Sequence, residues 1–217
     1  MTTDSLDNPR LRAALDYAAR GWAVFPLQHP TAEGECSCGR KCELFGKVTE
    51  RCAPDGIGKG PFVHNGHLIA TTETEKVREW WSVWREANIG INPALSGLVV
   101  IDVDAHDPRH RLPFAQLTAL IGKEALKTLT ARSANGGRHF YYRAPEGVKI
   151  VGGMNRLGEA IDVCAHALAV GVYVVAPPSR LATGRYVWVD AGPDRRAVLD
   201  LPPALIERLR ERPREGE

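Results

Sequence analysis

Apolar residues recur at helical spacing in four stretches of the chain, and these stretches predict helices. The expected helices are residues 8–20, 72–85, 107–122 and 201–212. In the second, Thr72 or Thr74 is a candidate N-cap, and acidic residues fill the first turn. The tryptophans of this helix lie on one apolar stripe, so we expect them in the core rather than on a base-stacking surface.

Shorter apolar runs of strand length alternate with the helices. They are residues 22–27, 88–91, 98–103, 139–144, 160–163, 171–176 and 186–189. Interleaved helices and strands predict an α/β or α+β fold, and 217 residues suit one large domain or two intimate subdomains. We expect the Gly-rich stretch 147–158 to form a flexible hairpin or a binding loop.

Residues 28–67 form a segment of about 40 residues with little periodicity, which is too long for an ordinary loop. Four of the five cysteines lie in it with the spacing C-x-C-x3-C-x9-C, and they are Cys36, Cys38, Cys42 and Cys52. Four thiolates in a short loop can bind zinc, and the metal then supplies folding energy that the loop cannot obtain from a core. A histidine can replace one cysteine, and the candidates are His29, His64 and His67. The prediction is a structural zinc site, and the alternative is a set of reduced surface thiols.

The overall composition excludes few functions. The net charge of +2 neither requires nor excludes nucleic acid, because a local basic groove is sufficient for binding. No apolar run approaches the roughly 20 residues of a membrane span, and the polar N-terminus has no signal-peptide core. We therefore expect a cytoplasmic protein that does not act at a membrane. In that compartment a cysteine cluster is more typical of a metal site than of disulfides.

Two carboxylates, Asp102 and Asp104, lie at the end of the apolar strand expected at residues 98–103. Side chains alternate along a strand, so the two share one face and are about 7 Å apart. Unpaired charges there are costly, and a divalent cation between them would remove the cost. Asp162 stands on a second apolar strand, and if the two strands are neighbours, three oxygen donors converge into a site for Mg²⁺ or Mn²⁺. Two such ions stabilise the attacking and leaving oxygens of a phosphoryl displacement.

A polar turn ending in Gly136 and Gly137 leads into Arg138 and His139 at the start of a strand. Backbone N–H groups of the turn, together with these two side chains, predict an anion site that would hold a triphosphate. The alternative for a lone histidine is a structural hydrogen bond. Combined with the three carboxylates, the anion site implies nucleotidyl transfer.

Lys59 lies in a second Gly-rich loop, residues 56–61. This loop is not a Walker A motif, because the G-x4-G-K-[ST] spacing is absent. The flanking glycines would let the backbone approach a phosphate, which makes Lys59 a candidate nucleotide-binding residue. A solvated charge is the ordinary alternative.

In their order along the chain, three of these features resemble the motifs of a known family. Residues 101–104 resemble a hydrophobic-Asp-hydrophobic-Asp motif, residues 136–139 a Ser-x-His-type motif, and residues 161–162 a hydrophobic-Asp motif. The family is the primase-polymerase (prim-pol) branch of the archaeo-eukaryotic primase superfamily, bifunctional DNA primase/polymerase N-terminal type. The tryptophan helix and the segment GVYVVAPPS also resemble it, and the likeness spans about residues 21–188.

The resemblance implies an archaeo-eukaryotic primase-like catalytic core of two small α/β units with the active site between them. The second unit would be similar to an RNA-recognition-type (RRM-like) sheet. The chain, residues 1–217, would then be a single prim-pol catalytic domain, with a zinc-binding insertion at about 29–67 and a C-terminal helix at about 201–212.

The implied activity is that of a DNA primase and DNA polymerase, a nucleotidyltransferase that makes or extends primers by two-metal phosphoryl transfer. Metal binding would fall to Asp102, Asp104 and Asp162, and binding of the nucleotide phosphates to His139 and Arg138. The implied partners are single-stranded or primed DNA, dNTP or NTP, and a helicase on a separate chain or in a missing C-terminal domain. The implied context is DNA replication of a plasmid, phage or mobile element.

Three positions depart from the family pattern. Gly60 stands where many relatives have histidine, so Cys52 or His64 would supply the fourth zinc ligand. Gly137 stands in place of serine, so a phosphate contact there would come from the backbone. Many relatives carry an arginine after the third aspartate, where this chain has Cys164, and this leaves one contact to nucleotide or template unassigned.

Three other classes of protein fit part of the pattern. A non-catalytic zinc module that binds nucleic acid would use the aspartates only as caps or ion-pair partners. A phosphatase of the haloacid-dehalogenase type also begins with DxD but needs a later acidic pair, where residues 161–164 offer one carboxylate. A DxD sugar transferase would leave the cysteine loop and the Gly-Gly-Arg-His turn without a role.

Overall fold

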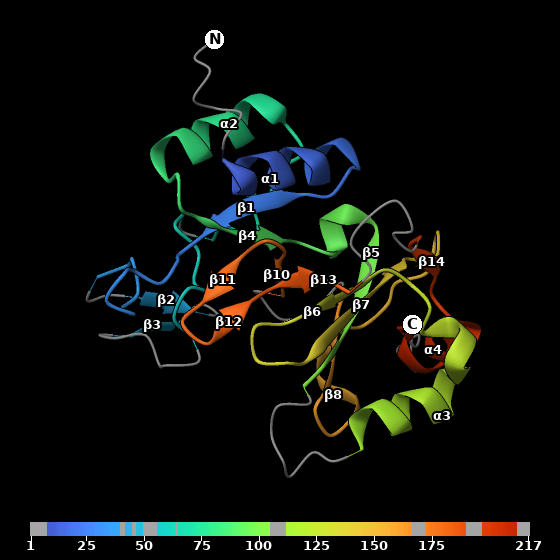
Figure 1. Ribbon diagram of the computed structural model, residues 1–217. Coiled ribbons are helices and arrows are strands. Elements are labelled where there is room, and N and C mark those ends of the chain that lie inside the picture. The colour runs from blue at the N-terminus through green and yellow to red at the C-terminus, as the bar shows by residue number, and fades with distance from the viewer. Residues whose placement is uncertain are drawn as a thin grey trace.

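The computed structural model describes residues 8–39, 42–44, 47–49, 56–63, 65–104, 112–165, 172–189 and 197–211. In this part of the chain, four α-helices accompany two larger sheets and two separate two-stranded hairpins. Figure 1 shows the smaller of the two sheets beneath α1 and α2, and the larger one beside α3 and α4. The expected mixture of helices with antiparallel sheets, an α+β fold, is confirmed.

The smaller sheet has the strand order β1-β4-β10, and both pairings are antiparallel. Its strands are β1 (Val24–Leu27), β4 (Asn88–Ile91) and β10 (Val174–Ala176), and all their residues are buried. Gly90 is the partner of Phe25 across β1 and β4. A Cβ on Gly90 would lie 2.6 Å from Cζ of Phe25, so glycine lets the aromatic ring lie over the strand.

α1 spans Pro9–Ala19, within the helix expected at residues 8–20. Asn8 is its N-cap, and the side chain accepts the backbone N–H groups of Arg10 and Leu11, which have no partner within the helix. Gly21 follows with a φ of 79°, a left-handed conformation that ends the helix without steric strain.

α2 spans Thr74–Val83, and its N-cap is Glu73, which makes no side-chain capping bond. The expected cap at Thr72 or Thr74 is therefore wrong. Thr71 is tied to β1 by a backbone bridge, and its hydroxyl accepts the N–H of Glu73 at 3.1 Å instead.

The two tryptophans within α2 and the one at its C-cap pack in the core, as expected. Trp80 and Trp81 are buried. Trp84 stacks on Phe62 with ring centroids 5.0 Å apart. The rings are thus used for packing and not for an open stacking surface.

The larger sheet has the order β13-β6-β7-β5-β9-β8, and β14 pairs in parallel with β7 beside this path. Its strands are β5 (Leu98–Val103), β6 (Thr130–Arg132), β7 (Arg138–Arg143), β8 (Gly153–Gly158), β9 (Ile161–Cys164), β13 (Val187–Trp188) and β14 (Leu199–Asp200). The helices are α3 (Pro113–Ala125) and α4 (Pro203–Leu209), and a short 3₁₀ helix, Ala94–Ser96, precedes β5. The Gly-rich stretch expected as a hairpin or loop contains β8, an edge strand that forms a hairpin with β9.

β5 is shared by two hydrophobic cores, because its side chains alternate between the faces of the sheet. Val99, Ile101 and Val103 belong to the core that includes residues of α3 and α4. Leu98 and Val100 belong to the core that includes residues of α1, α2 and the smaller sheet. The two sheets are therefore joined through the face of β5 that is opposite to α3 and α4.

The two separate hairpins are β2 (Cys42–Leu44) with β3 (Lys47–Thr49), and β11 (Arg180–Leu181) with β12 (Gly184–Arg185). Cys52 and His64 lie outside the described residues. The zinc-binding insertion and the RRM-like character of the second unit stay predictions. No helix in the described ranges is long and apolar enough to cross a membrane.

Candidate active site

One cross-strand row of the larger sheet carries the central candidate residues. Asp102 on β5 has His139 of β7 as its partner on one side and Asp162 of β9 on the other. The row continues through Ala131 of β6 to Trp188 of β13. Neighbouring strands are about 4.8 Å apart and directly paired side chains share a face, so His139, Asp102 and Asp162 stand side by side.

This row faces away from α3 and α4. The neighbouring pair on the same face, Val100 on β5 and Tyr141 on β7, belongs to the core shared with the smaller sheet. The apolar packing ends at the row, where 28% of the Asp102 side chain is exposed. Asp104 is exposed, and its backbone N–H donates to the carbonyl oxygen of Ala160 at 2.9 Å, which ties the end of β5 to the β8–β9 turn. The carboxylates thus gather at the rim of a core.

His139 is almost completely buried, with 5% of its side chain exposed. Its Nε2 lies 3.4 Å from Oδ2 of Asp102, and its Nδ1 is buried without a hydrogen-bond partner among the described residues. The imidazole packs against the ring of Tyr186, with centroids 5.6 Å apart. One ring nitrogen therefore faces a carboxylate while the other keeps its hydrogen-bonding capacity.

Asp162 is half-buried, and its Oδ1 accepts the backbone N–H of Asn155 at 2.6 Å. Burial raises the pKa of Asp162, the N–H of Asn155 lowers it, and the negative charges of Asp102 and Asp104 raise it further. The net shift of the Asp162 pKa is upward. The three carboxylates are therefore close enough to repel one another when all are ionised.

The donor set fits Mg²⁺ or Mn²⁺, which prefer carboxylate oxygens and water as ligands. Among the residues that the structure describes, no three His, Cys, Asp or Glu side chains lie close enough to hold an ion as placed. The carboxylates nevertheless share one face, and their charges act on the same pKa. A divalent cation would relieve both the burial of Asp162 and the repulsion, so metal binding here is taken up below as a proposal.

Arg138 does not lie with His139. The two are adjacent on β7 and so point to opposite faces of the sheet. The guanidinium carbon of Arg138 is 5.7 Å from the centre of the Phe114 ring on α3. The structure therefore does not bring together the two side chains of the predicted phosphate site.

Lys59 lies in a loop that is fixed to the smaller sheet. The hydroxyl of Tyr173 donates to the Lys59 carbonyl oxygen at 3.0 Å, and Nδ2 of Asn88 donates to the Gly58 carbonyl oxygen at 2.9 Å. Within the described ranges the Lys59 ammonium forms no ion pair. The loop backbone is thus held by two hydrogen bonds, while the Lys59 charge has no counter-charge among the described residues.

Gly136 and Gly137 close the turn between β6 and β7, and the N–H of Ser133 donates to the Gly137 carbonyl oxygen at 2.9 Å. A Cβ on Gly137 would lie 2.7 Å from the carbonyl oxygen of Val103 and 3.5 Å from Oδ1 of Asp104. The turn is therefore in close backbone contact with the end of β5. Glycine rather than serine at position 137 is explained by packing, because a Cβ there would clash with the Val103 carbonyl oxygen.

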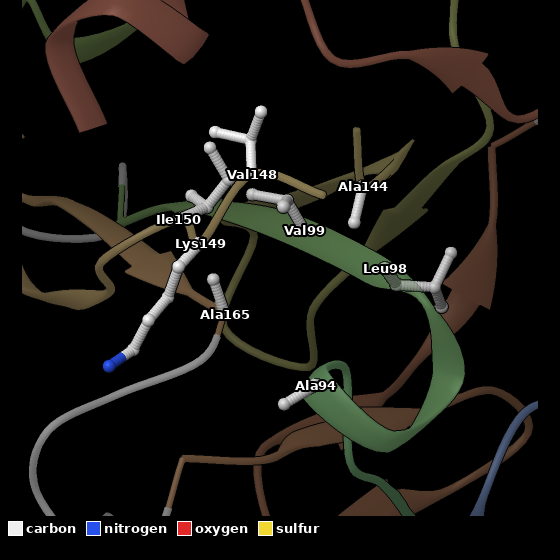
Figure 2. Close-up of a pocket in the computed structure, with 8 residues that line it drawn as sticks. All are labelled: Ala94, Leu98, Val99, Ala144, Val148, Lys149, Ile150 and Ala165. Carbon is white, nitrogen blue, oxygen red and sulfur yellow. The ribbon is translucent and has the colours of Figure 1, made fainter. Parts of the chain in front are cut away.

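A pocket of about 240 Å³ opens at the other end of β5 (Figure 2). Its lining is mostly apolar and consists of Ala94, Leu98, Val99, Ala144, Val148, Lys149, Ile150 and Ala165. Leu98 and Val99 begin β5, whereas Asp102 lies near its end. The pocket contains none of the candidate residues and is no part of the site.

A sequence model of the family described as bifunctional DNA primase/polymerase, N-terminal (Prim-Pol), matches residues 14–205. The chain belongs to the Prim-Pol family. The match includes the smaller sheet, the larger sheet and all three carboxylates of the Prim-Pol chain. The family resemblance noted in the sequence is therefore confirmed. A comparison with curated proteins gave no match.

Two residues of this Prim-Pol site were not predicted from the sequence. Tyr186 packs on His139, and burial followed by the charges of Asp102 and Asp104 raises the pKa of Tyr186. Asn155 binds Asp162 through its N–H from a left-handed conformation with a φ of 51°. An asparagine within a Gly-rich stretch is a weak signal for such a position, because asparagine tolerates positive φ. Tyr186 has no comparable signal, because only the folded sheet places it beside the row.

Gly137→Ser, which introduces the residue that the family resemblance implies at this position, is expected to lower the activity of this Prim-Pol chain rather than raise it. The new Cβ would meet the carbonyl oxygen of Val103, so the turn or the end of β5 must shift, and Asp104 would shift with it. A displacement of this kind costs roughly tenfold to hundredfold in kcat, which steady-state primer extension would measure. Gly147→Asn is the matched control, since a Cβ there meets nothing within 4 Å and asparagine tolerates its φ of 67°. Activity of Gly137→Ser at or above that of the parent chain would contradict the packing argument.

Proposed function

We propose that this Prim-Pol chain is a template-dependent nucleotidyltransferase that makes or extends primers on single-stranded DNA. Membership of the family supports primase and polymerase activity in general. The observation that carries the specific proposal is the row of His139, Asp102 and Asp162, with Asp104 at the end of the same strand. Such a row offers carboxylates for divalent cations beside a donor for phosphate, which is the combination that a metal–triphosphate complex needs. The context that the resemblance implies is replication of a plasmid, phage or mobile element.

The carboxylate oxygens of Asp102, Asp104 and Asp162 would hold Mg²⁺ or Mn²⁺. When bound, these ions would supply Lewis-acid stabilisation of the charge that develops on the transferred phosphoryl group. His139 would donate a hydrogen bond to a phosphate oxygen of the incoming nucleotide from Nε2, the nitrogen beside Asp102, because Nδ1 is buried.

Backbone and charge around the row would complete the nucleotide site. The N–H of Gly136 already donates to the Ser133 carbonyl oxygen at 3.1 Å, whereas the N–H of Gly137, in the residue next to the end of β5, would be available to a phosphate. Lys59 would add a positive charge from its loop. In the reaction, the 3′-hydroxyl oxygen of the primer bonds to the α-phosphorus, the bond from that phosphorus to the bridging oxygen of pyrophosphate breaks, and the hydroxyl proton passes to solvent.

Primer extension tests the proposal. The full chain is incubated with a labelled primer on a DNA template, one dNTP and Mn²⁺ or Mg²⁺, and we expect addition of the complementary nucleotide only. An unprimed template with labelled ATP and dNTPs separates priming from extension. Binding of DNA without incorporation under either metal would contradict the proposal and favour the non-catalytic zinc module. Phosphate release from a simple phosphomonoester without incorporation would favour a DxD phosphatase.

We also propose a structural zinc ion bound by Cys36, Cys38, Cys42 and a fourth ligand, either Cys52 or His64. Cys36 is buried and Cys38 half-buried in a tight turn. Cys42 follows at the first residue of β2. Thiolates within so short a segment suit zinc, which would stabilise a segment that has little core of its own.

Metal analysis of the purified protein is expected to give about one zinc per chain. Cys36→Ser should lower the zinc content well below one and lower the thermal midpoint, because a tetrahedral site with three remaining ligands binds more weakly. Cys164→Ser is the control for zinc content, since this cysteine lies on β9 and not in the cluster. Zinc-free protein whose cluster thiols all react with a thiol reagent under native conditions would contradict the zinc site.

A further inference from the structure

Two arginines stand directly opposite each other on the face of the larger sheet that packs against α3. Arg132 on β6 and Arg138 on β7 are the last paired residues before the turn 133–137, and Val103 on β5 continues their row. Arg132 is exposed, while Arg138 is half-buried and held over the Phe114 ring. The pair lies one residue beyond the row of His139 and Asp102 along the strands, at the same end of the sheet but on its reverse face.

No carboxylate neutralises this pair in the part of the chain that the structure describes. The ion pairs there involve other residues, and neither guanidinium donates a hydrogen bond to a described residue. Like charges directly opposite on an antiparallel pair destabilise the sheet, because the two side chains are only about 5 Å apart at Cβ. Two guanidinium groups on directly paired residues, without a counter-charge among the described residues, are suited to an anion with several oxygens.

We propose that Arg132 and Arg138 bind the phosphodiester backbone of the single-stranded DNA template. This rests on the proposed function, because it requires that a template pass the row of carboxylates. The incoming nucleotide would be held on the opposite face by His139, so its own phosphates are not the ones that this pair meets. A DNA strand that crosses this end of the larger sheet can place phosphates near both of its faces. A single nucleotide bound at His139 cannot reach the reverse face.

Binding of a fluorescein-labelled oligothymidylate to the full chain, without nucleotide or divalent metal, tests the pair by anisotropy over a range of salt concentrations. We expect Arg132→Ala to weaken binding about fivefold or more and to reduce the slope of log K against log salt by about one. Arg138→Ala should behave in the same way. Arg132→Lys should keep the salt slope, because it keeps the charge. Arg78→Ala, an exposed arginine on α2, is the matched control and should leave both quantities unchanged.

The outcomes separate this proposal from the proposed function. At saturating DNA we expect the KM for dNTP to be the same in Arg132→Ala as in the parent chain. Unchanged DNA affinity and salt slope, or a raised KM for dNTP with unchanged DNA affinity, would overturn the proposal. Weaker DNA binding in the arginine variants of a chain that incorporates no nucleotide would overturn the polymerase activity and leave the DNA contact standing. If Arg138→Ala melts early, the exposed Arg132 carries the test alone.

Discussion

Asp102→Asn is expected to lower single-turnover nucleotide incorporation by roughly 10³-fold while the protein stays folded. Asp102 stands between His139 and Asp162: its Oδ2 is 3.4 Å from Nε2 of His139, and it is paired in register with Asp162 on the other side. Asparagine has nearly the same shape but no charge, so it is a poor ligand for Mg²⁺ or Mn²⁺. Rapid-quench primer extension with saturating DNA and Mn²⁺ would measure the loss. Full activity in this variant would show that the row is not the catalytic centre.

Asp162→Asn is the companion substitution, and it should lose activity while gaining thermal stability in metal-free buffer at pH 7. Burial, and then the charges of Asp102 and Asp104, raise the pKa of Asp162 in the folded chain. An acid whose pKa is higher in the folded than in the unfolded chain destabilises the fold wherever it is ionised, and a neutral amide removes that effect. Loss of activity with a raised thermal midpoint cannot come from a damaged fold. Asp16→Asn, an exposed residue of α1, changes the net charge equally and should do neither.

Asn88→Ala is expected to lower the free energy of unfolding by about 3 kcal/mol or more. Its side chain is fully buried. Nδ2 donates to the carbonyl oxygens of Gly58 at 2.9 Å and Arg180 at 2.7 Å, and Oδ1 accepts the N–H of Arg180 at 2.9 Å. Alanine would leave these backbone groups without partners in a buried place, and each costs about 1 kcal/mol or more. For a chain of this size the thermal midpoint should fall by about 6–12 °C, which calorimetry would measure.

Asn8→Ala provides the matched control for Asn88→Ala. Asn8 also accepts backbone N–H groups, but it does so at the partly exposed start of α1, and its loss should cost about 1 kcal/mol. Asn88 joins the loop of Lys59 to the segment after β10 that leads to Tyr186, so its loss should also raise the KM for dNTP at temperatures where the variant is folded. Equal, small losses of stability in the two variants would contradict this linking role.

β5 shows how far a sequence pattern reaches. Alternation alone places Asp102 on the opposite face from Ile101 and Val103, and the structure agrees, since those two apolar residues enter the core under α3 and α4. The sequence did not predict the register, only that Asp162 lies on another apolar strand. A shift by one residue between β5 and β9 would turn Asp162 to the reverse face, and the packing of the whole sheet, not any local pattern, sets that register.

Arg138 and His139 show the opposite case. Strand alternation was sufficient to predict that their side chains point to opposite faces, but the Gly-Gly-Arg-His motif suggested a shared site. The two residues are neighbours in the sequence, and a Gly-Gly-Arg-His turn groups them naturally around one anion. Strand alternation separates them, because adjacent residues on β7 face opposite sides. The zinc cluster is different again, because Cys52 lies outside the described residues and its role as a zinc ligand stays a prediction.

Because β5 contributes one face to each hydrophobic core, neither core of the described residues is complete without this strand. Removing the rest of either core would expose a row of apolar side chains on the strand that bears Asp102. A movement that parted the two sheets would expose Leu98 and Val100 to solvent, so we expect the sheets to stay packed together. Asp102 should keep its position relative to both sheets through a catalytic cycle, and any movement that admits nucleotide or DNA must come from the turns and hairpins at the rim.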